Sequence, residues 1–159
     1  MAEFSYFWDN PGTGDAPALG YDNEDMYEVL RMIFNGTGDQ GVLLGWLDEL
    51  ECTDGGADTV TVLPGGAYAY GMWFESDDNE DIDVNAYRGG NCLIVVRAVW
   101  ATQTVRIVAR AVGALTQVAG NTWEIPLYTM SVGGAGAVAV VTDDRDYCEF
   151  STDLQSGAV

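Results

Sequence analysis

The side chains best suited to chemistry are carboxylates, and their densest run is Glu75-Ser76-Asp77-Asp78-Asn79-Glu80-Asp81-Ile82-Asp83. Clustered carboxylate and amide oxygens are the ligands that hard cations such as Ca²⁺ prefer. The weak metal candidates in this run are Asp77, Asn79, Asp81 and Asp83. The first three match the spacing of an EF-hand loop, but Ile82 replaces its turn glycine and Arg88 its bidentate glutamate. We therefore expect a solvated loop between two strands, with an opportunistic Ca²⁺ or Na⁺ site as the alternative.

A second group of carboxylates lies at Asp143-Asp144-Arg145-Asp146. Adjacent residues of an extended chain point to opposite sides, so this run does not predict a catalytic pair. An ion pair that ends a strand, or a contact with a neighbouring subunit, is the preferred interpretation. The chain has no His and no Lys, which excludes a histidine base, a Schiff-base lysine and a P-loop lysine. We expect no catalytic residue, no enzymatic activity and no cofactor beyond the cation considered above.

Three cysteines, Cys52, Cys92 and Cys148, are 40 and 56 residues apart and form no CxxC motif. This spacing predicts small buried residues in a reducing compartment. A Cys52–Cys148 or Cys92–Cys148 disulfide stays open at this stage.

The elements that would position these residues are mostly strands. After Gly56 the hydrophobic pattern has a period of two, with turn residues about every ten positions, which predicts an antiparallel β-sandwich or barrel of about seven strands. The strongest predicted hairpin joins Leu93–Trp100 to Val105–Arg110 through a turn at Ala101–Gln103. Its Arg106 and Arg110 share one strand face. The seven runs are Thr59–Leu63, Ala67–Glu75, Ile82–Ala86, Cys92–Ala101, Thr104–Val112, Trp123–Val132 and Ala137–Thr142.

The part of the chain before these strands has a different character. One short α-helix is predicted from Asp22 or Asn23 to about Phe34, because Met26, Leu30 and Ile33 recur at helical spacing. We divide the chain into an N-terminal arm and flexible segment (1–21), a helix and connecting turn (22–51), a β-sandwich or barrel domain (52–148) and a C-terminal tail (149–159). The arm carries four aromatic residues that either dock on a partner or cover the protein's own core: Phe4, Tyr6, Phe7 and Trp8.

The charges fall into three zones, an acidic segment 1–87, a basic segment 88–123 and an acidic segment 124–159. The 159 residues include 25 Asp and Glu and six Arg, for a formal net charge of −19. The segment 88–123 contains no acidic residue and forms a basic island, which we expect to meet an acidic zone of a neighbouring subunit. Its members, which together with the aromatic arm make up the predicted assembly interface, are Arg88, Arg97, Arg106 and Arg110.

Composition also bears on partners and environment. With so few cations the chain is not expected to bind nucleic acid, and no run of 18 apolar residues predicts membrane insertion. No signal peptide is expected from the acidic, aromatic N-terminus. An excess of acid without lysine is typical of proteins in molar salt, where charge repulsion is screened, so we hypothesise a halophilic host.

The order of the segments is more specific than any one of them. The chain resembles a β-rich structural module of tailed-virus tail-fibre and baseplate-associated proteins. The resemblance rests on the following pieces in this order: Phe4-Ser5-Tyr6-Phe7-Trp8, Gly41-Val42, Pro64-Gly65-Gly66-Ala67-Tyr68-Ala69-Tyr70-Gly71, Leu93–Arg97 with Thr104–Ile107, Trp123–Leu127 and Thr142–Cys148.

The resemblance implies a non-enzymatic virion protein, made in the host cytoplasm, in the tail, baseplate, fibre-attachment or collar region. It further implies a homo-oligomer, with a trimer favoured, and contacts with other virion proteins through the N-terminal arm. The alternatives are a capsid decoration or turret protein and a carbohydrate-binding β-sandwich for host attachment. For the last of these, Trp73, Trp100 and Trp123 are the candidate stacking platform.

Overall fold

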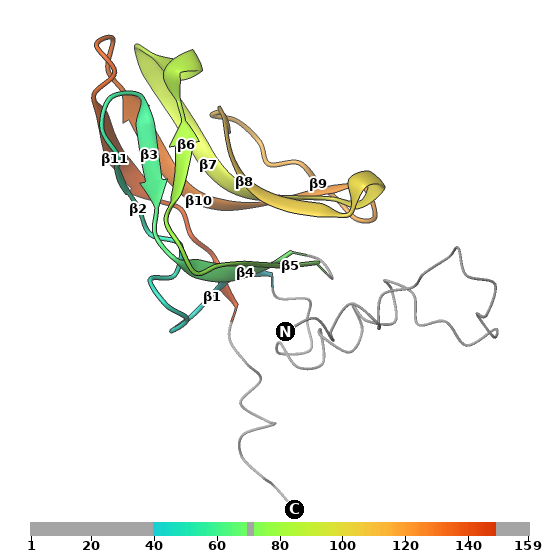
Figure 1. Ribbon diagram of the computed structural model, residues 1–159. Helices are drawn as coiled ribbons and strands as arrows, with labels where there is room; N and C mark the ends of the chain where they lie inside the picture. Colours follow the sequence, from blue (N-terminus) through green and yellow to red (C-terminus); the bar gives the residue numbers. More distant parts are fainter. Residues whose placement is uncertain (1–39, 70–71, 149–159) are drawn as a thin grey trace, which may run out of the picture.

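The computed structural model of the protein describes residues 40–69 and 72–148 (Figure 1). The predicted N-terminal arm, the predicted helix at 22–34 and the C-terminal tail lie outside the described residues. The described residues contain no α-helix, and none of their helical segments is long and apolar enough to cross a membrane. The strands are β1 (Gly41–Leu43), β2 (Cys52–Asp54), β3 (Thr59–Val62), β4 (Gly65–Ala69), β5 (Met72–Ser76), β6 (Glu80–Asp83), β7 (Gly90–Val99), β8 (Thr104–Ala111), β9 (Gln117–Val118), β10 (Thr122–Val132), β11 (Val138–Asp143) and β12 (Tyr147–Cys148), with 3₁₀ turns η2 (Asn85–Tyr87) and η3 (Trp100–Thr102).

The strands form three sheets. Sheet A has the order β12-β1-β4-β5, sheet B the order β2-β3-β6, and sheet C the order β11-β10-β7-β8, with β9 paired to β10. All pairs are antiparallel except β1 with β12. The long strands of sheet C curve along one side, and sheets A and B pack against them (Figure 1). The mainly β prediction is therefore confirmed, as a layered arrangement of open sheets and not as a closed barrel.

One bent ribbon connects sheets B and A. Strand β3 pairs with β6, and their continuations β4 and β5 pair with each other. The ribbon bends at Leu63-Pro64 on one strand and at residues 77–79 on the other. Pro64 has no backbone N–H to give to a ladder, which suits the break between the two pairings.

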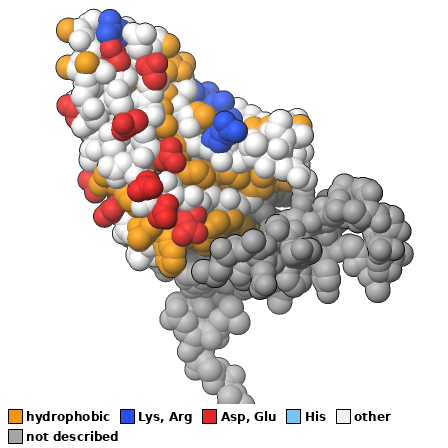
Figure 2. Space-filling model, in the orientation of Figure 1, with side chains coloured by type: hydrophobic (Ala, Val, Ile, Leu, Met, Phe, Trp, Pro, Cys, Tyr) orange, Lys and Arg blue, Asp and Glu red, His pale blue; other side chains and the backbone are white. Residues whose placement is uncertain are grey.

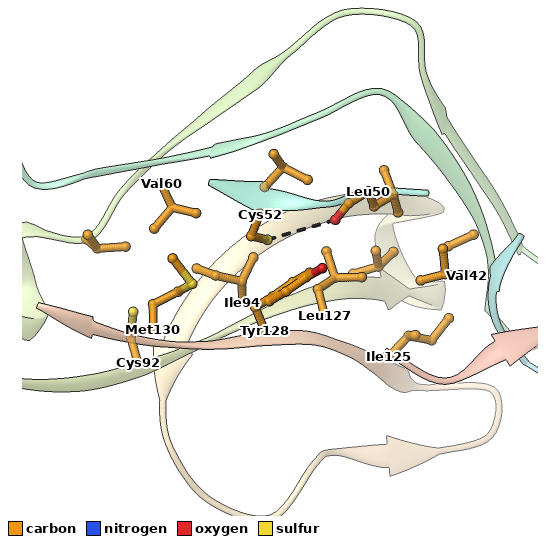
Figure 3. Packing of buried hydrophobic residues seen from close by; sticks show 14 of the residues in the cluster. Val42, Leu50, Cys52, Val60, Cys92, Ile94, Ile125, Leu127, Tyr128 and Met130 are labelled. Atoms are coloured by element: carbon orange, nitrogen blue, oxygen red, sulfur yellow. Dashed lines mark hydrogen bonds between the residues drawn. The ribbon is translucent and has the colours of Figure 1, made fainter. Parts of the chain in front are cut away.

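A single apolar core joins the three sheets (Figure 3). Alternate residues of the long strands β7 and β8 point into it, as the pleat requires. The fully buried side chains around its centre include Val42 of sheet A, Val60 of sheet B, and Ile94 and Leu127 of sheet C. Val42 and Leu50 belong to this core although they come from the segment that the sequence assigns to a helix and connecting turn.

Two of the predicted strand runs are wrong in detail. The run Ala67–Glu75 is two strands, β4 and β5, paired in register from Ala69↔Met72 to Gly65↔Ser76. Every residue of β4 is buried, so its alternation is weak and the sequence does not mark the reversal. The run Ile82–Ala86 ends early, because the Asp83 carboxylate accepts the Asn85 N–H at 2.8 Å and starts η2. The β7–η3–β8 hairpin is confirmed.

Candidate interaction surface

Sheet C presents one face to the core and the other outward. On β7, Ile94 and Val96 point into the core, and the alternate residue Arg97 points to the outer face. On β8, Arg106 and Arg110 share that outer face, opposite the residues that pack against the core, as the sequence predicts. Three members of the predicted basic island therefore lie on one face of one sheet.

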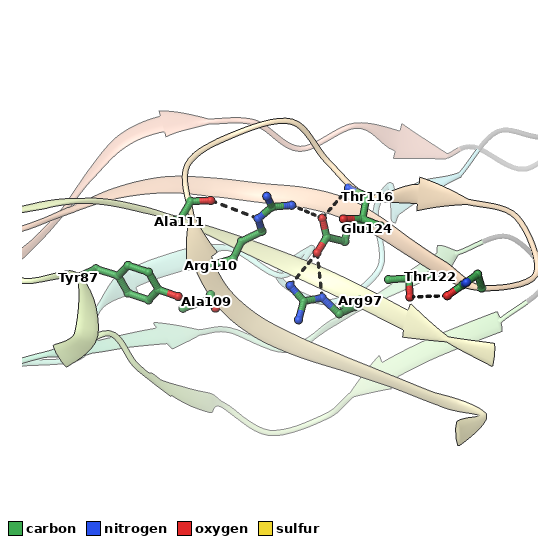
Figure 4. A network of polar contacts seen from close by, with 9 residues as sticks. Tyr87, Arg97, Ala109, Arg110, Ala111, Thr116, Thr122 and Glu124 are labelled. Atoms are coloured by element: carbon green, nitrogen blue, oxygen red, sulfur yellow. Dashed lines mark hydrogen bonds and ion pairs between the residues drawn. The ribbon is translucent and has the colours of Figure 1, made fainter. Parts of the chain in front are cut away.

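The buried carboxylate of Glu124 binds two of these arginines, Arg97 and Arg110 (Figure 4). Glu124 of β10 is 1% exposed, and its Oε1 accepts from Arg97 Nε at 2.8 Å and pairs with Nη2 at 2.7 Å. Arg110 Nη1 pairs with Oε2, which also accepts the Thr116 N–H at 2.8 Å. Burial alone would raise the pKa of Glu124, but the Thr116 N–H and the two guanidinium groups hold it below its ordinary value.

The chain segment 112–116 closes over this carboxylate. Strand β8 is at one edge of sheet C, whereas β9 pairs with β10 on the side away from β7, so the segment between them must cross the sheet. It crosses the outer face, where Thr116 binds the Glu124 side chain. The Glu124 N–H donates to the Thr116 carbonyl at 2.9 Å, and Gln117 Nε2 donates to the Glu124 carbonyl at 3.1 Å. The ion pairs therefore hold the outer surface of sheet C together.

The other two arginines of the island are placed differently. Arg88 follows η2 and donates through Nε to Asp58 Oδ1 at 2.6 Å, which lowers the pKa of that carboxyl. Arg106 is exposed, lies in register with Arg97, and makes no ion pair or hydrogen bond with the part of the chain that the structure describes. Figure 2 shows the basic side chains in two separate places on the visible face. Three of the four predicted interface arginines, Arg88, Arg97 and Arg110, therefore have ion-pair partners within their own chain, and Arg106 has none among the described residues.

The acidic run of residues 75–83 is divided by the ribbon bend. Asp77 and Asn79 lie in the bend, whereas Asp81 lies on β6 and accepts the Thr61 hydroxyl at 2.6 Å. The Asp83 carboxylate accepts the Asn85 N–H just before η2, as described above. Within residues 40–69 and 72–148, no three Asp, Glu, Cys or His side chains gather to form a metal site. The four weak metal candidates are thus not brought to one point.

The second acidic group forms the predicted ion pair. Arg145 donates to both oxygens of Asp143, at 2.9 and 2.6 Å, and this lowers the pKa of Asp143 to about 2. The guanidinium lies 4.9 Å from the ring centroid of Tyr128 and 5.3 Å from that of Tyr147, and donates to the Glu49 carbonyl at 3.0 Å. This arrangement ties the end of β11 to the turn after β1. The contacts of Arg145 therefore have a structural role, because they fix these two segments relative to each other.

That turn, residues 44–50, is not predicted by the sequence pattern. Leu47, Glu49 and Leu50 have φ values of 53°, 55° and 56°, a left-handed conformation that costs energy in residues with a Cβ. The Pro64 carbonyl accepts two N–H groups of the turn, and the Leu50 side chain is fully buried. Three anchors therefore hold a strained backbone in one shape: the Arg145 contact, the Pro64 carbonyl and the buried Leu50.

The same turn displays apolar side chains. Leu44, Trp46 and Leu47 are between 44% and 55% exposed. Gly45 N–H donates to Glu49 Oε1 at 2.6 Å and closes the loop on itself. A strained backbone that is held by several contacts and presents exposed apolar groups is typical of a binding element.

The remaining sequence candidates can be placed as well. Trp100 and Trp123 pack against the core, whereas Trp73 is half exposed on sheet A, so the three do not form one stacking platform. The cysteines are all buried free thiols, as expected, and burial raises the pKa of Cys52 and Cys92. The aromatic arm residues lie outside the described residues.

Comparison of the chain with models of protein families and with curated proteins finds no match in either.

Proposed function

We propose that this chain is a non-enzymatic structural protein of a tailed-virus particle that assembles as a homo-oligomer, with a trimer favoured, in the tail, baseplate, fibre-attachment or collar region. The order of its sequence motifs supports the particle assignment. The observation that carries the assembly part is the turn 44–50, a rigid loop with three exposed apolar side chains. Contacts with other virion proteins through the N-terminal arm belong to the same proposal.

The size of the turn suits a subunit contact. Full burial of a large apolar side chain contributes about 1.5–3 kcal/mol, so removing the remaining exposed half of three such side chains contributes about 3 kcal/mol per subunit. Tryptophan is also enriched at the energetic centres of interfaces. Because the backbone of the turn is already fixed, little conformational entropy is lost when a partner binds.

The charge pattern favours assembly in salt. The net charge of −19 makes copies repel one another at low ionic strength, and this repulsion is screened at high ionic strength. Arg106 is the exposed cation best placed on sheet C to meet an acidic group of a neighbour. The proposed interface therefore combines apolar burial at the turn with a charge contact at Arg106.

The test is the oligomeric state, measured by sedimentation equilibrium from low to multimolar NaCl. We expect the wild type to form a discrete oligomer and the Trp46→Ser plus Leu47→Ser variant to dissociate. A matched control replaces Val140 and Val141 of β11 with Ser, because these are 48% and 53% exposed yet lie away from the turn. Equal assembly of the two variants, or a wild type that is monomeric throughout, would contradict the proposal.

The charge part has its own test. Arg106→Glu is expected to weaken assembly in light scattering, with Arg106→Gln intermediate. Arg110 is left unchanged in this test because it holds Glu124. Assembly of Arg106→Glu equal to wild type would remove the charge contact from the proposal. The particle assignment is tested separately by neighbouring genes: portal, capsid or tape-measure genes are expected, and a metabolic operon would overturn it.

A further inference from the structure

Two strands of sheet C have an open side. In the order β11-β10-β7-β8, β11 and β8 are the outermost strands and lie at opposite edges of the sheet (Figure 1). Every residue of β11 from Ala139 to Asp143 is exposed, and Val140 and Val141 are 48% and 53% exposed. An apolar edge strand offers main-chain N–H and C=O groups to another strand, and proteins commonly protect such edges with Lys or Pro. Neither residue occurs in β11.

The two edges suit each other in direction and in face. Strand β8 is antiparallel to β7, β7 is antiparallel to β10, and β10 is antiparallel to β11. A second copy placed beside the first in the same orientation therefore brings its β8 antiparallel to β11. The outer face of its sheet, which carries Arg106, then continues the outer face of the first sheet.

The main-chain groups on the open side of β8 can be assigned. The Ala109 carbonyl accepts the Tyr87 hydroxyl at 3.1 Å, so it points away from β7. Main-chain groups alternate in direction along an antiparallel strand, so those of Val105 and Ile107 also point to the open side. Because Tyr87 already binds the Ala109 carbonyl, the part of this edge that is open to another strand is residues 104–108.

The open side of β11 follows in the same way. The Ala137 carbonyl accepts an N–H from the turn after β10 at 2.7 Å, and the Asp144 N–H donates to a β10 carbonyl at 2.9 Å. Alternation from these two positions leaves the main-chain groups of Val140 and Asp143 pointing away from β10. The bulge in the β10–β11 register lies between these two residues. Both edges therefore carry free donors and acceptors at defined positions.

We infer that sheet C continues from one copy of this chain to the next, with β11 of one copy paired to β8 of its neighbour. This inference rests on the proposed homo-oligomer and names a second contact within it. Pairing Val140 with Ile107 of the neighbour aligns their main-chain groups and puts both side chains on the core side of the joined sheet. Because of the bulge, Thr142 then lies opposite the neighbour's Arg106 on the outer face.

Charge selects this register. Asp144 is two residues after Thr142, and its carboxylate accepts the Thr129 hydroxyl at 2.6 Å. Diagonal neighbours on paired strands are about 7–8 Å apart, within reach of a long side chain. Arg106, which forms no ion pair with the described residues, therefore meets Asp144 of the adjoining copy. A shift of the register by two residues would keep the main-chain match but lose this charge contact.

The joined edges lie beside the turn 44–50. Arg145 comes directly after β11 and donates to the Glu49 carbonyl at 3.0 Å, so a copy bound on β11 is next to the turn. Because β11 and β8 are different surfaces, their contact is heterologous and can close into a ring, as a trimer requires. The hydrogen bonds of the joined sheet are made by main-chain groups, which Val140→Ser plus Val141→Ser leaves in place.

Charge reversal tests the register. At the lowest NaCl concentration at which the wild type assembles, we expect Arg106→Glu and Asp144→Arg each to weaken association about tenfold in sedimentation equilibrium. The two substitutions together should restore association to within about threefold of the wild type. Arg106→Glu plus Asp146→Arg is the matched control, because it has the same net charge but reverses a different carboxylate. Rescue by both pairs, or by neither, would overturn the register.

Disulfide cross-linking tests the pairing of the strands. In this register Val108 of one copy lies opposite Ala139 of the next in a non-hydrogen-bonded pair, with Cα atoms about 4.5 Å apart, close enough for a disulfide. A mixture of Val108→Cys and Ala139→Cys chains should therefore form a disulfide-linked dimer on mild oxidation. Val112→Cys is the matched control: Val112 is 56% exposed but follows the end of β8, so it should not cross-link to Ala139→Cys.

The outcomes separate this inference from the proposed function. An oligomer in which Val108→Cys and Ala139→Cys do not cross-link would overturn the pairing of the sheet edges and leave the contact through the turn 44–50 standing. A cross-linked oligomer that is insensitive to Trp46→Ser plus Leu47→Ser would do the reverse. A wild type that is monomeric at every salt concentration would overturn both.

Discussion

The Glu124 cluster makes a quantitative prediction. Both carboxylate oxygens of Glu124 accept from a guanidinium, and one also accepts the Thr116 N–H. Glu124→Gln keeps the size of the side chain, but it removes the charge and turns an amide N–H₂ group toward groups that are donors. The substitution therefore leaves two guanidinium groups without their counter-charge at a site that is 1% exposed.

The expected loss of unfolding free energy depends on how well water can replace the Glu124 carboxylate as the partner of the two arginines. Removing one member of a fully buried ion pair costs about 3–5 kcal/mol. The side chains of Arg97 and Arg110 are 34% and 22% exposed, so water can reach both and the lower end applies, about 3 kcal/mol. With a urea slope of about 2 kcal/mol per molar, the unfolding midpoint falls by about 1.5 M.

The assay is urea unfolding followed by Trp fluorescence, because urea, unlike guanidinium, does not screen charge. Asp77→Asn is the control: it removes an exposed carboxylate at the ribbon bend and should change stability by less than about 0.5 kcal/mol. Amide exchange in residues 112–118 should accelerate in Glu124→Gln, because the crossing segment loses its anchor. A midpoint equal to that of Asp77→Asn would refute the reasoning.

The argument from unpaired charge also predicts that removing the charges of Arg97, Glu124 and Arg110 together lowers stability less than removing the charge of Glu124 alone. Arg97→Met, Glu124→Leu and Arg110→Met together replace a buried ionic cluster with apolar side chains of similar volume, which is often neutral or stabilising. We expect this triple variant to regain most of the stability lost in Glu124→Gln. A triple variant less stable than the single one would show that the geometry of the cluster matters beyond its charge.

Two further predictions concern solution conditions. In the folded protein the pKa of Asp143 is lowered to about 2, and the pKa of Glu124 is also lowered. Their contribution to stability is therefore present above the ordinary carboxyl pKa and is lost as pH falls from about 4 toward 2. Urea midpoints measured between pH 6 and pH 2 should decline in this window, and they should decline by less in Asp143→Asn. The melting temperature should rise with NaCl from low to multimolar concentration as the net charge of −19 is screened, and a melting temperature independent of salt would contradict the halophilic expectation.

The part of the fold that sequence could predict is the part with long, regular strands. The ten residues of β7 and the eight of β8 carry enough alternation to place the hairpin and to put Arg106 and Arg110 on one face. Strands β1 and β12 have three and two residues, too few to show a period. Their parallel pairing, Val42↔Tyr147, joins residues from opposite ends of the described chain, which no local pattern predicts.

The distribution of charge along the chain does not reveal the buried carboxylate of Glu124. The boundary between the basic island 88–123 and the acidic segment 124–159 separates Glu124 from Arg97 along the chain, although the register of β10 and β7 places them side by side. A usable signal was present: Glu124 is an isolated acid between Trp123 and Ile125 in an apolar strand. A buried acid of this kind needs a cation or several N–H donors. The strained turn 44–50 had no comparable signal, because its shape depends on the distant Pro64 and Arg145.

The internal ion pairs change what the net charge means for assembly. Of the five arginines in the described residues, Arg88, Arg97, Arg110 and Arg145 form ion pairs within the chain, which leaves Arg106 as the cation available to a neighbour there. The surface offered to another copy is therefore more uniformly acidic than the basic island suggests. Two such acidic surfaces approach each other only where salt screens their repulsion, or where apolar burial outweighs that repulsion. At 1 M salt the screening length is about 3 Å. Association through the turn 44–50 should therefore strengthen with NaCl, the opposite of the behaviour of an interface made by complementary charges.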